Sequence, residues 1–335
     1  VKNPNYWRDD YQVAGDVYHV PDAGKFQKPE WERLAKNIYS DPAVAGIEIS
    51  NCSPTTTLDC FPKRLLWQVL PRNDARLTAR CTALIKAFGR FDLLKGLVQS
   101  IRARSSELRI DCLDDSGRLS ESMIDELRAY GVRFIESPEF DIGLSAGRNL
   151  LLANCETPYF ILLDEDFLFT EKTDFLSALH LLNCSSIDLI GGAVFDVGPD
   201  AQPHNQPRSF VGDLEKTADG VLRIHPSSEA RRSVEGLPLC DLVMNFFVAK
   251  LASVRRVGWS EELKLGEHLD FFMRAQQAGL NIHYFSGMQV DHVQHFGNAS
   301  SGYGEARSRA SEYLKAFRSM HGLVKIVKYG VEIPG

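Results

Sequence analysis

The chain has 335 residues, and its hydrophobic share of 44% and charged share of 24% are those of an ordinary globular protein. Its formal net charge is -6 and its lysines and arginines form no stripe, which argues against duplex nucleic acid as a partner. An acidic chain can still bind a phosphorylated small molecule, because one divalent cation and a few arginines neutralise a diphosphate locally.

The start of the chain and its cysteines bear on the compartment. The first residues, VKNP, show no signal-peptide pattern, and no apolar run approaches the roughly 18 residues that cross a bilayer. Because the chain does not begin with Met, removal of an anchor or leader stays an open alternative. The 7 cysteines form no CxxC pair, which argues against a zinc cluster. Cys52 and Cys60 flank a polar loop and would pair in an oxidising compartment.

The order of apolar segments predicts an α/β fold. Residues 1–75 are rich in Pro, Asp and Asn, and we interpret them as a wrapping flank with one helix at 29–38. Beyond them, short apolar runs alternate with amphipathic segments, which is typical of a Rossmann-like fold with a single mixed, mainly parallel sheet flanked by helices. The expected strands are 82–87, 108–113, 132–135, 159–163, 189–195, 242–249 and 282–285. The expected helices are near 93–101, 119–130, 144–154, 174–182, 267–278 and 304–320, and the stretch up to residue 238 is expected to be rich in loops.

An acidic triplet, Asp164-Glu165-Asp166, follows the buried strand 159–163 directly. In open α/β sheets, ligands collect outside the carboxyl ends of the strands, so the triplet falls on the ligand edge. Two carboxylates separated by one residue can converge on Mn²⁺ or Mg²⁺. The cation would hold a diphosphate and stabilise the departing phosphate. The competing interpretation is a solvated acidic turn.

Two other segments are predicted to face the same edge. Asp114 and Asp115 end the strand 108–113 and would suit the base or ribose of a nucleotide, with a DDSG turn as the alternative. Arg148 lies near a helix start, where it would reach a phosphate or the base. The glycines before it do not have GxGxxG spacing, which disfavours a dinucleotide site.

Acid–base and further metal candidates lie later in the chain. Glu267 and Asp270 are three residues apart on one helix face, where either could deprotonate an acceptor hydroxyl. A solvated acidic helix start is the alternative. His292 follows a strand-like segment and, with His295, offers a third metal ligand or a phosphate contact, although a lone histidine is more often a structural hydrogen-bonder.

Taken in order, seven short segments resemble the β1,4-N-acetylgalactosaminyltransferase family of ganglioside synthesis, within the wider glycosyltransferase type A fold. They lie between about Cys81 and His292. The segments are DDS at 114–116, AGRN at 146–149, DEDF at 164–167, DLIGGAV at 188–194, NFFVA at 245–249, HLDFF at 268–272 and VDH at 290–292.

The resemblance implies inverting transfer of a sugar, GalNAc or another hexose or N-acetylhexosamine, from a UDP-sugar to a glycan hydroxyl. It implies that Asp164 and Asp166 bind Mn²⁺ (or Mg²⁺), with His292 as an additional ligand. It points to Asp270 as the base, with Glu267 as the fallback. The donor-nucleotide residues would be Asp114, Asp115, Arg148, Glu165 and Lys86, and the residues near the acceptor or donor sugar would be Gly191, Gly192 and Asn245.

Two residues depart from the pattern of the family. Asp270 stands where Glu is expected, which shortens the reach of the base by one methylene, and Lys86 stands where an arginine is common. The donor sugar and the acceptor therefore stay open.

The resemblance also sets expectations for organisation and partners. Residues 76–295 would form the glycosyltransferase domain, with a nucleotide half at 76–170 and an acceptor half at 171–295, followed by a helical tail at 296–335. The expected partners are a UDP-sugar and a glycan, glycolipid or glycoprotein acceptor, with a homodimer left open and nucleic acid excluded. The expected location is the Golgi lumen, with the bacterial cytoplasm or inner-membrane face as the alternative.

Two other functions compete with this hypothesis. A sugar-nucleotide nucleotidyltransferase also uses an α/β sheet, paired aspartates and Mg²⁺, but it would carry a Gly-rich basic loop near its start, and none is visible. A non-catalytic domain that binds a nucleotide sugar or a glycan would keep the fold without the metal, which the intact triplet argues against.

Overall fold

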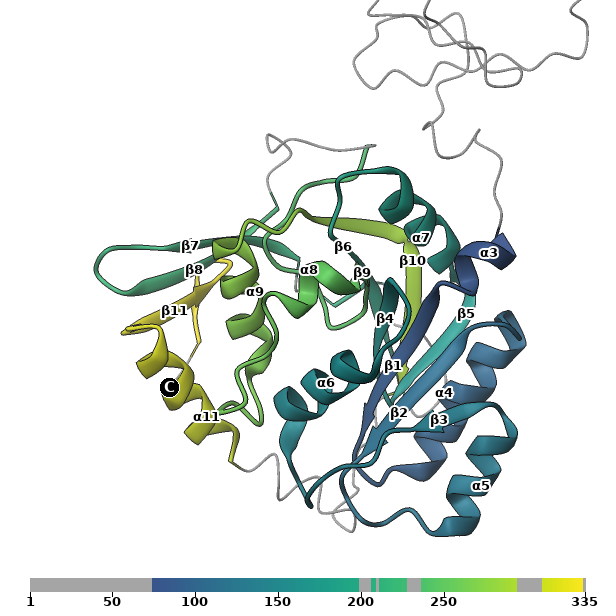
Figure 1. Ribbon diagram of the computed structural model, residues 1–335. Coiled ribbons are helices and arrows are strands. Elements are labelled where there is room, and N and C mark those ends of the chain that lie inside the picture. Colours follow the sequence, from purple (N-terminus) through teal and green to yellow (C-terminus); the bar gives the residue numbers. More distant parts are fainter. Residues whose placement is uncertain (1–73, 199–205, 209–210, 228–235, 294–308, 334–335) are drawn as a thin grey trace, which may run out of the picture. The chain divides into compact units, whose positions relative to one another are not determined.

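The computed structural model describes residues 74–198, 206–208, 211–227, 236–293 and 309–333, all within one compact unit, Pro71–Gly335 (Figure 1). The predicted flank lies outside these residues except for its last two, as do its helix at 29–38, the Cys52 and Cys60 pair, and His295. Across the described ranges, no helix is both long enough and apolar enough to cross a membrane.

The larger sheet has eight strands in the order β3-β2-β1-β4-β9-β6-β10-β5 (Figure 1). They are β1 (Cys81–Ala87), β2 (Arg109–Asp114), β3 (Val132–Phe134), β4 (Tyr159–Asp164), β5 (Phe167–Thr173), β6 (Leu189–Val197), β9 (Phe247–Lys250) and β10 (Ile282–Val293). The strands from β3 to β4 run parallel, as does the pair β6 and β10. By contrast, β9 is antiparallel to both neighbours, and β5 is antiparallel to β10. The sheet is therefore mixed, and the prediction that it is mainly parallel is wrong.

The reversal that the prediction missed occurs at the acidic triplet. β4 ends at Asp164 and β5 begins at Phe167, so the chain turns within two residues. After this turn, β5 does not pair with β4 but runs antiparallel to β10 at the far edge of the sheet. This pairing sets Phe167 opposite His292.

Helices cover both faces of the larger sheet (Figure 1). α4 (Phe91–Arg104) and α5 (Glu121–Ala129) lie on one face, and α6 (Gly143–Asn154) lies on the other. The helix expected near 93–101 is present as α4, whose apolar residues at three- and four-residue spacing are at most 1% exposed: Leu94, Leu97, Val98 and Ile101. Burying each such side chain contributes about 1.5–3 kcal/mol. The other helices are α3 (Asp74–Thr78), α7 (Phe175–Cys184), α8 (Leu251–Arg255), α9 (Glu267–Gln277) and α11 (Ala310–Met320).

A second sheet of four strands was not predicted. Its order is β12-β11-β8-β7, formed by β7 (Gly212–Lys216), β8 (Val221–Pro226), β11 (Lys325–Lys328) and β12 (Val331–Glu332). The loop-rich stretch therefore contains a hairpin, and the C-terminal residues add strands to the predicted helix. Phe317 and Ile326 are buried in the same cluster as Leu222 of β8, so the described part of the C-terminal region packs on the core.

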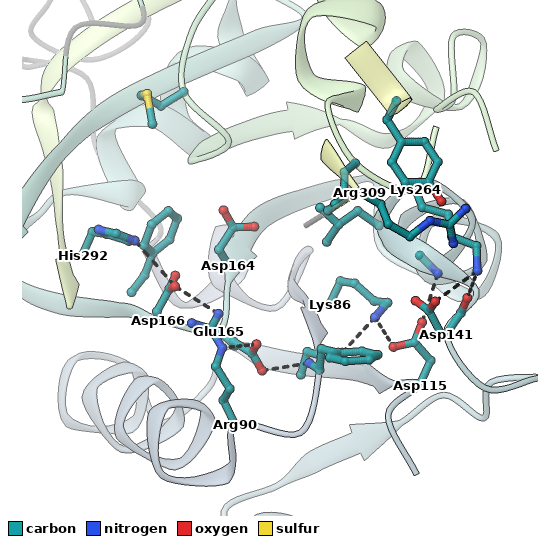
Figure 2. A pocket seen from close by; sticks show the side chains of 18 of the residues that line it. Lys86, Arg90, Asp115, Asp141, Asp164, Glu165, Asp166, Lys264, His292 and Arg309 are labelled. Carbon is teal, nitrogen blue, oxygen red and sulfur yellow. Dashed lines mark hydrogen bonds and ion pairs between the residues drawn. The ribbon is translucent and has the colours of Figure 1, made fainter. Parts of the chain in front are cut away.

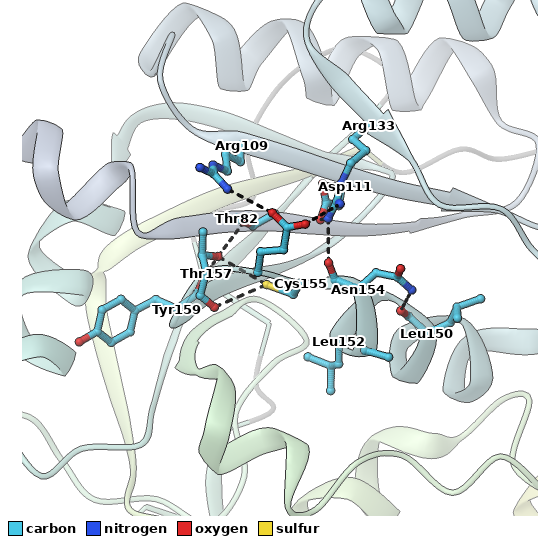
Figure 3. Close-up of polar contacts among 12 residues, drawn as sticks. Thr82, Arg109, Asp111, Arg133, Leu150, Leu152, Asn154, Cys155, Thr157 and Tyr159 are labelled. Atoms are coloured by element: carbon cyan, nitrogen blue, oxygen red, sulfur yellow. Dashed lines mark hydrogen bonds and ion pairs between the residues drawn. The ribbon is translucent and has the colours of Figure 1, made fainter.

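Polar contacts near the starts of the parallel strands connect the first strands of the larger sheet to one another (Figure 3). Arg133 of β3 donates to Asp111 Oδ2 at 2.6 Å and to the carbonyl of Asn154 at 2.8 Å. The hydroxyls of Thr82 and Thr157 lie 2.7 Å apart at the start of β1. These contacts fix the edge strand and the α6–β4 connection, while the carboxyl ends of β1 and β4 open into a cavity.

Candidate active site

The cavity lies at the carboxyl ends of the parallel strands and collects residues from distant parts of the chain (Figure 2). Six predicted site residues line it: Lys86, Asp115, Asp164, Glu165, Asp166 and His292. The structure does not bring the other predicted residues to its wall. Asp114, Arg148, Gly191, Gly192, Asn245, Glu267 and Asp270 are not among the lining residues.

Asp166 lines the cavity and has a buried carboxylate oxygen without a hydrogen-bond partner. Its Oδ2 lies 3.0 Å from Nη2 of Arg90 and 3.5 Å from Nε2 of His292. Its Oδ1 is buried and has no hydrogen-bond partner. A buried carboxylate oxygen without a donor costs free energy, so this atom marks a position where a cation or a donor from a ligand would be favourable.

Glu165 braces the loop that follows β1. Its Oε2 accepts from the backbone N–H of Phe88 at 2.9 Å, and its Oε1 accepts from Nε of Arg90 at 2.6 Å (Figure 2). With only 2% of its surface exposed, Glu165 is a support for Arg90 rather than a free ligand. Arg90 thereby spans the two acids that end the triplet.

Arg148 connects the triplet to α9. Its guanidinium is 1% exposed and donates to Asp164 Oδ1 at 2.9 Å and to Glu267 Oε1 at 2.5 Å. It also lies over the ring of Trp259, 5.6 Å from the ring centre. Glu267 is itself 3% exposed. Because Arg148 donates to both acids, a single side chain bridges Glu267 and Asp164.

Lys86 and Asp115 join β1 to the start of α6. Nζ of Lys86 donates to Asp115 Oδ1 at 2.5 Å, and Asp115 Oδ2 accepts from the backbone N–H of Gly143 at 3.1 Å. Gly147 makes room for the lysine stem, because a Cβ there would come within 2.5 Å of Lys86 Cδ. Asp114 turns away from the cavity and accepts from the backbone N–H of Gly89 at 2.6 Å, so it shapes the loop after β1.

Asp270 lies in different surroundings from those expected of a base. It is 0% exposed, and its Oδ2 accepts from Nη2 of Arg274 at 2.8 Å while its Oδ1 lies 2.8 Å from Nε2 of His321. Both oxygens of Asp270 therefore have ion-pair partners, and the residue does not line the cavity. The role of Asp270 as the base therefore stays a prediction, and Glu267 is the acid of this helix that shares Arg148 with Asp164.

The glycines and the asparagine expected near the sugar have packing contacts. A Cβ at Gly191 would lie 2.4 Å from Cβ of Val243, and a Cβ at Gly192 would lie 2.4 Å from the carbonyl of Met288. Both glycines thus allow close packing over β6. Asn245 donates weakly to Glu267 Oε1 at 3.4 Å, and its own Oδ1 is buried without a partner.

Opposing charges around the triplet shift its pKa values in different directions. Burial raises the pKa of Glu165 to about 7, against the lowering effect of Arg90. Burial also acts to raise the pKa of Asp166, but the neighbouring His292 and the charge of Arg90 outweigh it and hold that pKa at about 2. Burial raises the pKa of Asp164 even though Arg148 opposes it. The cavity therefore holds acids that differ strongly in proton affinity.

The donor set of the triplet fits a hard divalent cation. Two carboxylates and one imidazole nitrogen, from Asp164, Asp166 and His292, are groups that bind Mn²⁺ or Mg²⁺, and the unpartnered Oδ1 of Asp166 needs an electropositive neighbour. Within the described ranges, no three acidic, histidine or cysteine side chains are grouped as a metal site. Arg148 and Arg90 neutralise the two aspartates in this arrangement.

Several lining residues were not predicted. Arg90 follows β1 after a phenylalanine and a glycine. A basic residue just beyond a strand, at the ligand edge of the sheet, is the sequence signal that could have identified it. Lys264 and Arg309 also line the cavity (Figure 2), as does Tyr313, from segments at least a hundred residues after β4. No local pattern marks those three, because tertiary packing alone brings them to the edge.

The chain is similar in sequence to known glycosyltransferases. Residues 82–233 match glycosyl transferase family 2. The β-1,4 N-acetylgalactosaminyltransferase 1 of Rattus norvegicus is 30% identical over 221 residues, which is 65% of this chain and 39% of that protein. The β-1,4 N-acetylgalactosaminyltransferase 2 of Mus musculus is 29% identical over 221 residues, covering 64% of this chain and 40% of that protein.

The resemblance to the β1,4-N-acetylgalactosaminyltransferases is confirmed. A crystal structure of GalNAc-T7 with UDP, GalNAc and Mn²⁺ has a TM-score of 0.51 and 12% identity, over 74% of this chain and 55% of that chain. The fold is thus the predicted glycosyltransferase type A fold. The chain spans about two fifths of the length of the curated relatives that it matches.

The surroundings of Asp270 predict a role in stability. We expect Asp270→Asn to lower the free energy of unfolding by about 3–5 kcal/mol at neutral pH, because Arg274 and His321 lose a buried charged partner. Burial acts to raise the pKa of Asp270, but the bonds from His321 and Arg274 hold it at about 2. Since this is below the unfolded value of about 3.9, the stabilisation is present above that value and is lost as pH falls toward 2.

Urea unfolding followed by circular dichroism at neutral and acid pH measures this difference. Glu171→Gln is the matched control, because Glu171 is 86% exposed and lies 3.7 Å from Arg104, so we expect a change of less than about 0.5 kcal/mol. Equal stability of Asp270→Asn and the native protein at neutral pH would contradict the structural role.

Proposed function

We propose that the chain is the catalytic part of an inverting, metal-dependent glycosyltransferase that moves an N-acetylhexosamine, GalNAc first among the candidates, from a UDP-sugar to a glycan hydroxyl. The observation that carries the proposal is the acidic triplet at the end of β4, where Asp166 keeps a buried oxygen without a partner beside His292. The names of the curated relatives support the choice of sugar, and the neighbouring structure with UDP, GalNAc and Mn²⁺ is compatible with the donor and the metal.

Asp164, Asp166 and His292 would hold the cation. A bound Mn²⁺ or Mg²⁺ supplies Lewis-acid stabilisation to the departing nucleotide phosphate. Arg148 and Arg90 neutralise the same aspartates, and Arg90, which lines the cavity, would also meet the donor phosphates. The low pKa of Asp166 supports a metal role, because the carboxylate is already ionised throughout the neutral range.

The donor nucleotide would lie along the ends of β1 and β2. Lys86 and Asp115 both line the cavity and carry opposite charges, so together they can meet a phosphate and a ribose hydroxyl. Glu165 would act through Arg90, which it orients, and Asp114 would act through the loop that it braces. These two acids would shape the nucleotide site without binding the nucleotide directly.

Glu267 is the better candidate for the base that deprotonates the acceptor hydroxyl. Its carboxylate contacts the same guanidinium as Asp164, which puts it beside the position where the leaving group would be stabilised. A direct displacement forms the new C–O bond as the bond to the UDP oxygen breaks, and the hydroxyl proton passes to a Glu267 oxygen. Asn245, which donates to Glu267, would help to orient it.

The acceptor, the location and the assembly remain predictions. A glycan, a glycolipid or a glycoprotein would serve as acceptor, and the Golgi lumen is the location expected from the family resemblance. A homodimer stays open. A nucleotidyltransferase or a non-catalytic binding domain would give different outcomes in the following experiments.

Metal-dependent nucleotide binding tests the proposed function. We expect calorimetric titration with UDP to give a clear binding curve with Mn²⁺ and at least a tenfold weaker one without it, because the cation would clamp the diphosphate. GDP and CMP should bind more weakly than UDP. Asp166→Ala should abolish the effect of Mn²⁺, whereas Glu171→Gln, an exposed acid outside the cavity, should leave it unchanged. Absence of UDP binding with Mn²⁺ would overturn the proposal, and binding without UDP-sugar hydrolysis would favour a binding domain.

The role of Glu267 gives a separate prediction. Glu267→Gln keeps the size of the side chain and its contact with Arg148, so we expect UDP affinity within about threefold of native. Transfer to a water or sugar acceptor should fall by about 10²–10⁴-fold, the range of general-base contributions. Radiolabelled UDP-sugar turnover measures the loss. Native turnover in this variant would show that the base lies elsewhere.

A further inference from the structure

The ring of His292 lies between two carboxylates from different segments. Its Nε2 faces Asp166 Oδ2 at 3.5 Å, while its Nδ1 lies 2.7 Å from Asp196 Oδ1. Asp196 is the register partner of His292 in the parallel pairing of β6 and β10, so both side chains project from the same face of the sheet. The contact between them is therefore set by strand register, and no loop has to close to form it.

The direction of the hydrogen bond between His292 and Asp196 follows from a third residue, Arg208. Asp196 Oδ1 also accepts from Nε of Arg208 at 2.7 Å. An arginine only donates and an ionised carboxylate only accepts, so Nδ1 of His292 must carry the proton that it shares with Asp196. The lone pair of the neutral ring is then on Nε2, the nitrogen that faces the acidic triplet (Figure 2).

We propose that Asp196 is a positioning residue, which fixes the ring and tautomer of His292 so that Nε2 serves as a cation ligand, with Arg208 holding Asp196 in place. This inference rests on the proposed function, because it requires a divalent cation beside Asp166. Asp196 does not line the cavity, so it acts through His292. A carboxylate bound to the far nitrogen of a ligand histidine orients the ring and raises its basicity, which strengthens metal binding.

A purely structural role for Asp196 would have a different consequence. The side chains of Arg208 and Asp196 are 38% and 20% exposed, and an ion pair that is open to water contributes about 0–1 kcal/mol. The ring of Phe167 packs edge-on against His292 at 5.8 Å and supports its other side. Loss of Asp196 should therefore change metal affinity much more than the stability of the fold.

The experiment compares Asp196→Asn with Asp291→Asn in the full chain. Asp291 precedes His292 on the same strand, so its side chain alternates to the other face, and it lies outside the cavity. Free Mn²⁺ is followed by electron paramagnetic resonance during titration in the presence of UDP. We expect the Mn²⁺ dissociation constant to rise about 10–100-fold for Asp196→Asn and to stay native for Asp291→Asn. Turnover of UDP-sugar by Asp196→Asn should recover at saturating Mn²⁺.

A second measurement does not depend on the metal. Long-range ¹⁵N–¹H correlation spectra of the metal-free protein report which nitrogen of His292 carries the proton when the ring is neutral. We expect protonation at Nδ1 in the native protein and a loss of that preference in Asp196→Ala, with thermal unfolding as the check on the fold. Unchanged Mn²⁺ affinity in Asp196→Asn would overturn this inference alone. Absence of Mn²⁺ binding to the native protein would overturn the inference together with the proposed function.

Discussion

The arrangement of the site depends on one buried guanidinium, that of Arg148. It is 1% exposed and pairs with Asp164 at the end of β4 and with Glu267 at the start of α9, more than a hundred residues apart. A charge buried this deeply needs its partners, because loss of one partner from a buried ion pair costs about 3–5 kcal/mol. The electrostatic requirement of a single side chain thus holds the triplet and the acid of α9 in one geometry.

A second constraint is the reversal of the chain at the triplet. Two residues separate β4 from β5, which sends β5 antiparallel along β10 and sets Phe167 opposite His292. Asp166 and His292 meet for that reason, although 126 positions separate them in the sequence. The acids that follow β4 and the histidine of β10 therefore line the same cavity.

The sequence was sufficient to predict the parts of the fold that local patterns encode. The spacing of Leu94, Leu97 and Ile101 gave α4, and the run of buried residues before Asp164 gave β4, with the triplet at its end. The second sheet was missed because its strands are short and β11 joins β8 across a hundred residues. Asp270 was expected to be the base with Glu267 as the fallback, whereas the structure pairs Glu267 with Arg148 and Asp270 with Arg274 and His321. Only tertiary contacts carry that distinction.

The central claim is that the triplet and His292 form the metal site at which UDP is held. Anomalous diffraction at the manganese edge, from crystals grown with UDP and Mn²⁺, tests it most directly. We predict one strong anomalous peak bonded to Asp166 and His292, next to the diphosphate. UDP density in the cavity without a manganese peak at these residues, or a peak elsewhere on the chain, would contradict the account.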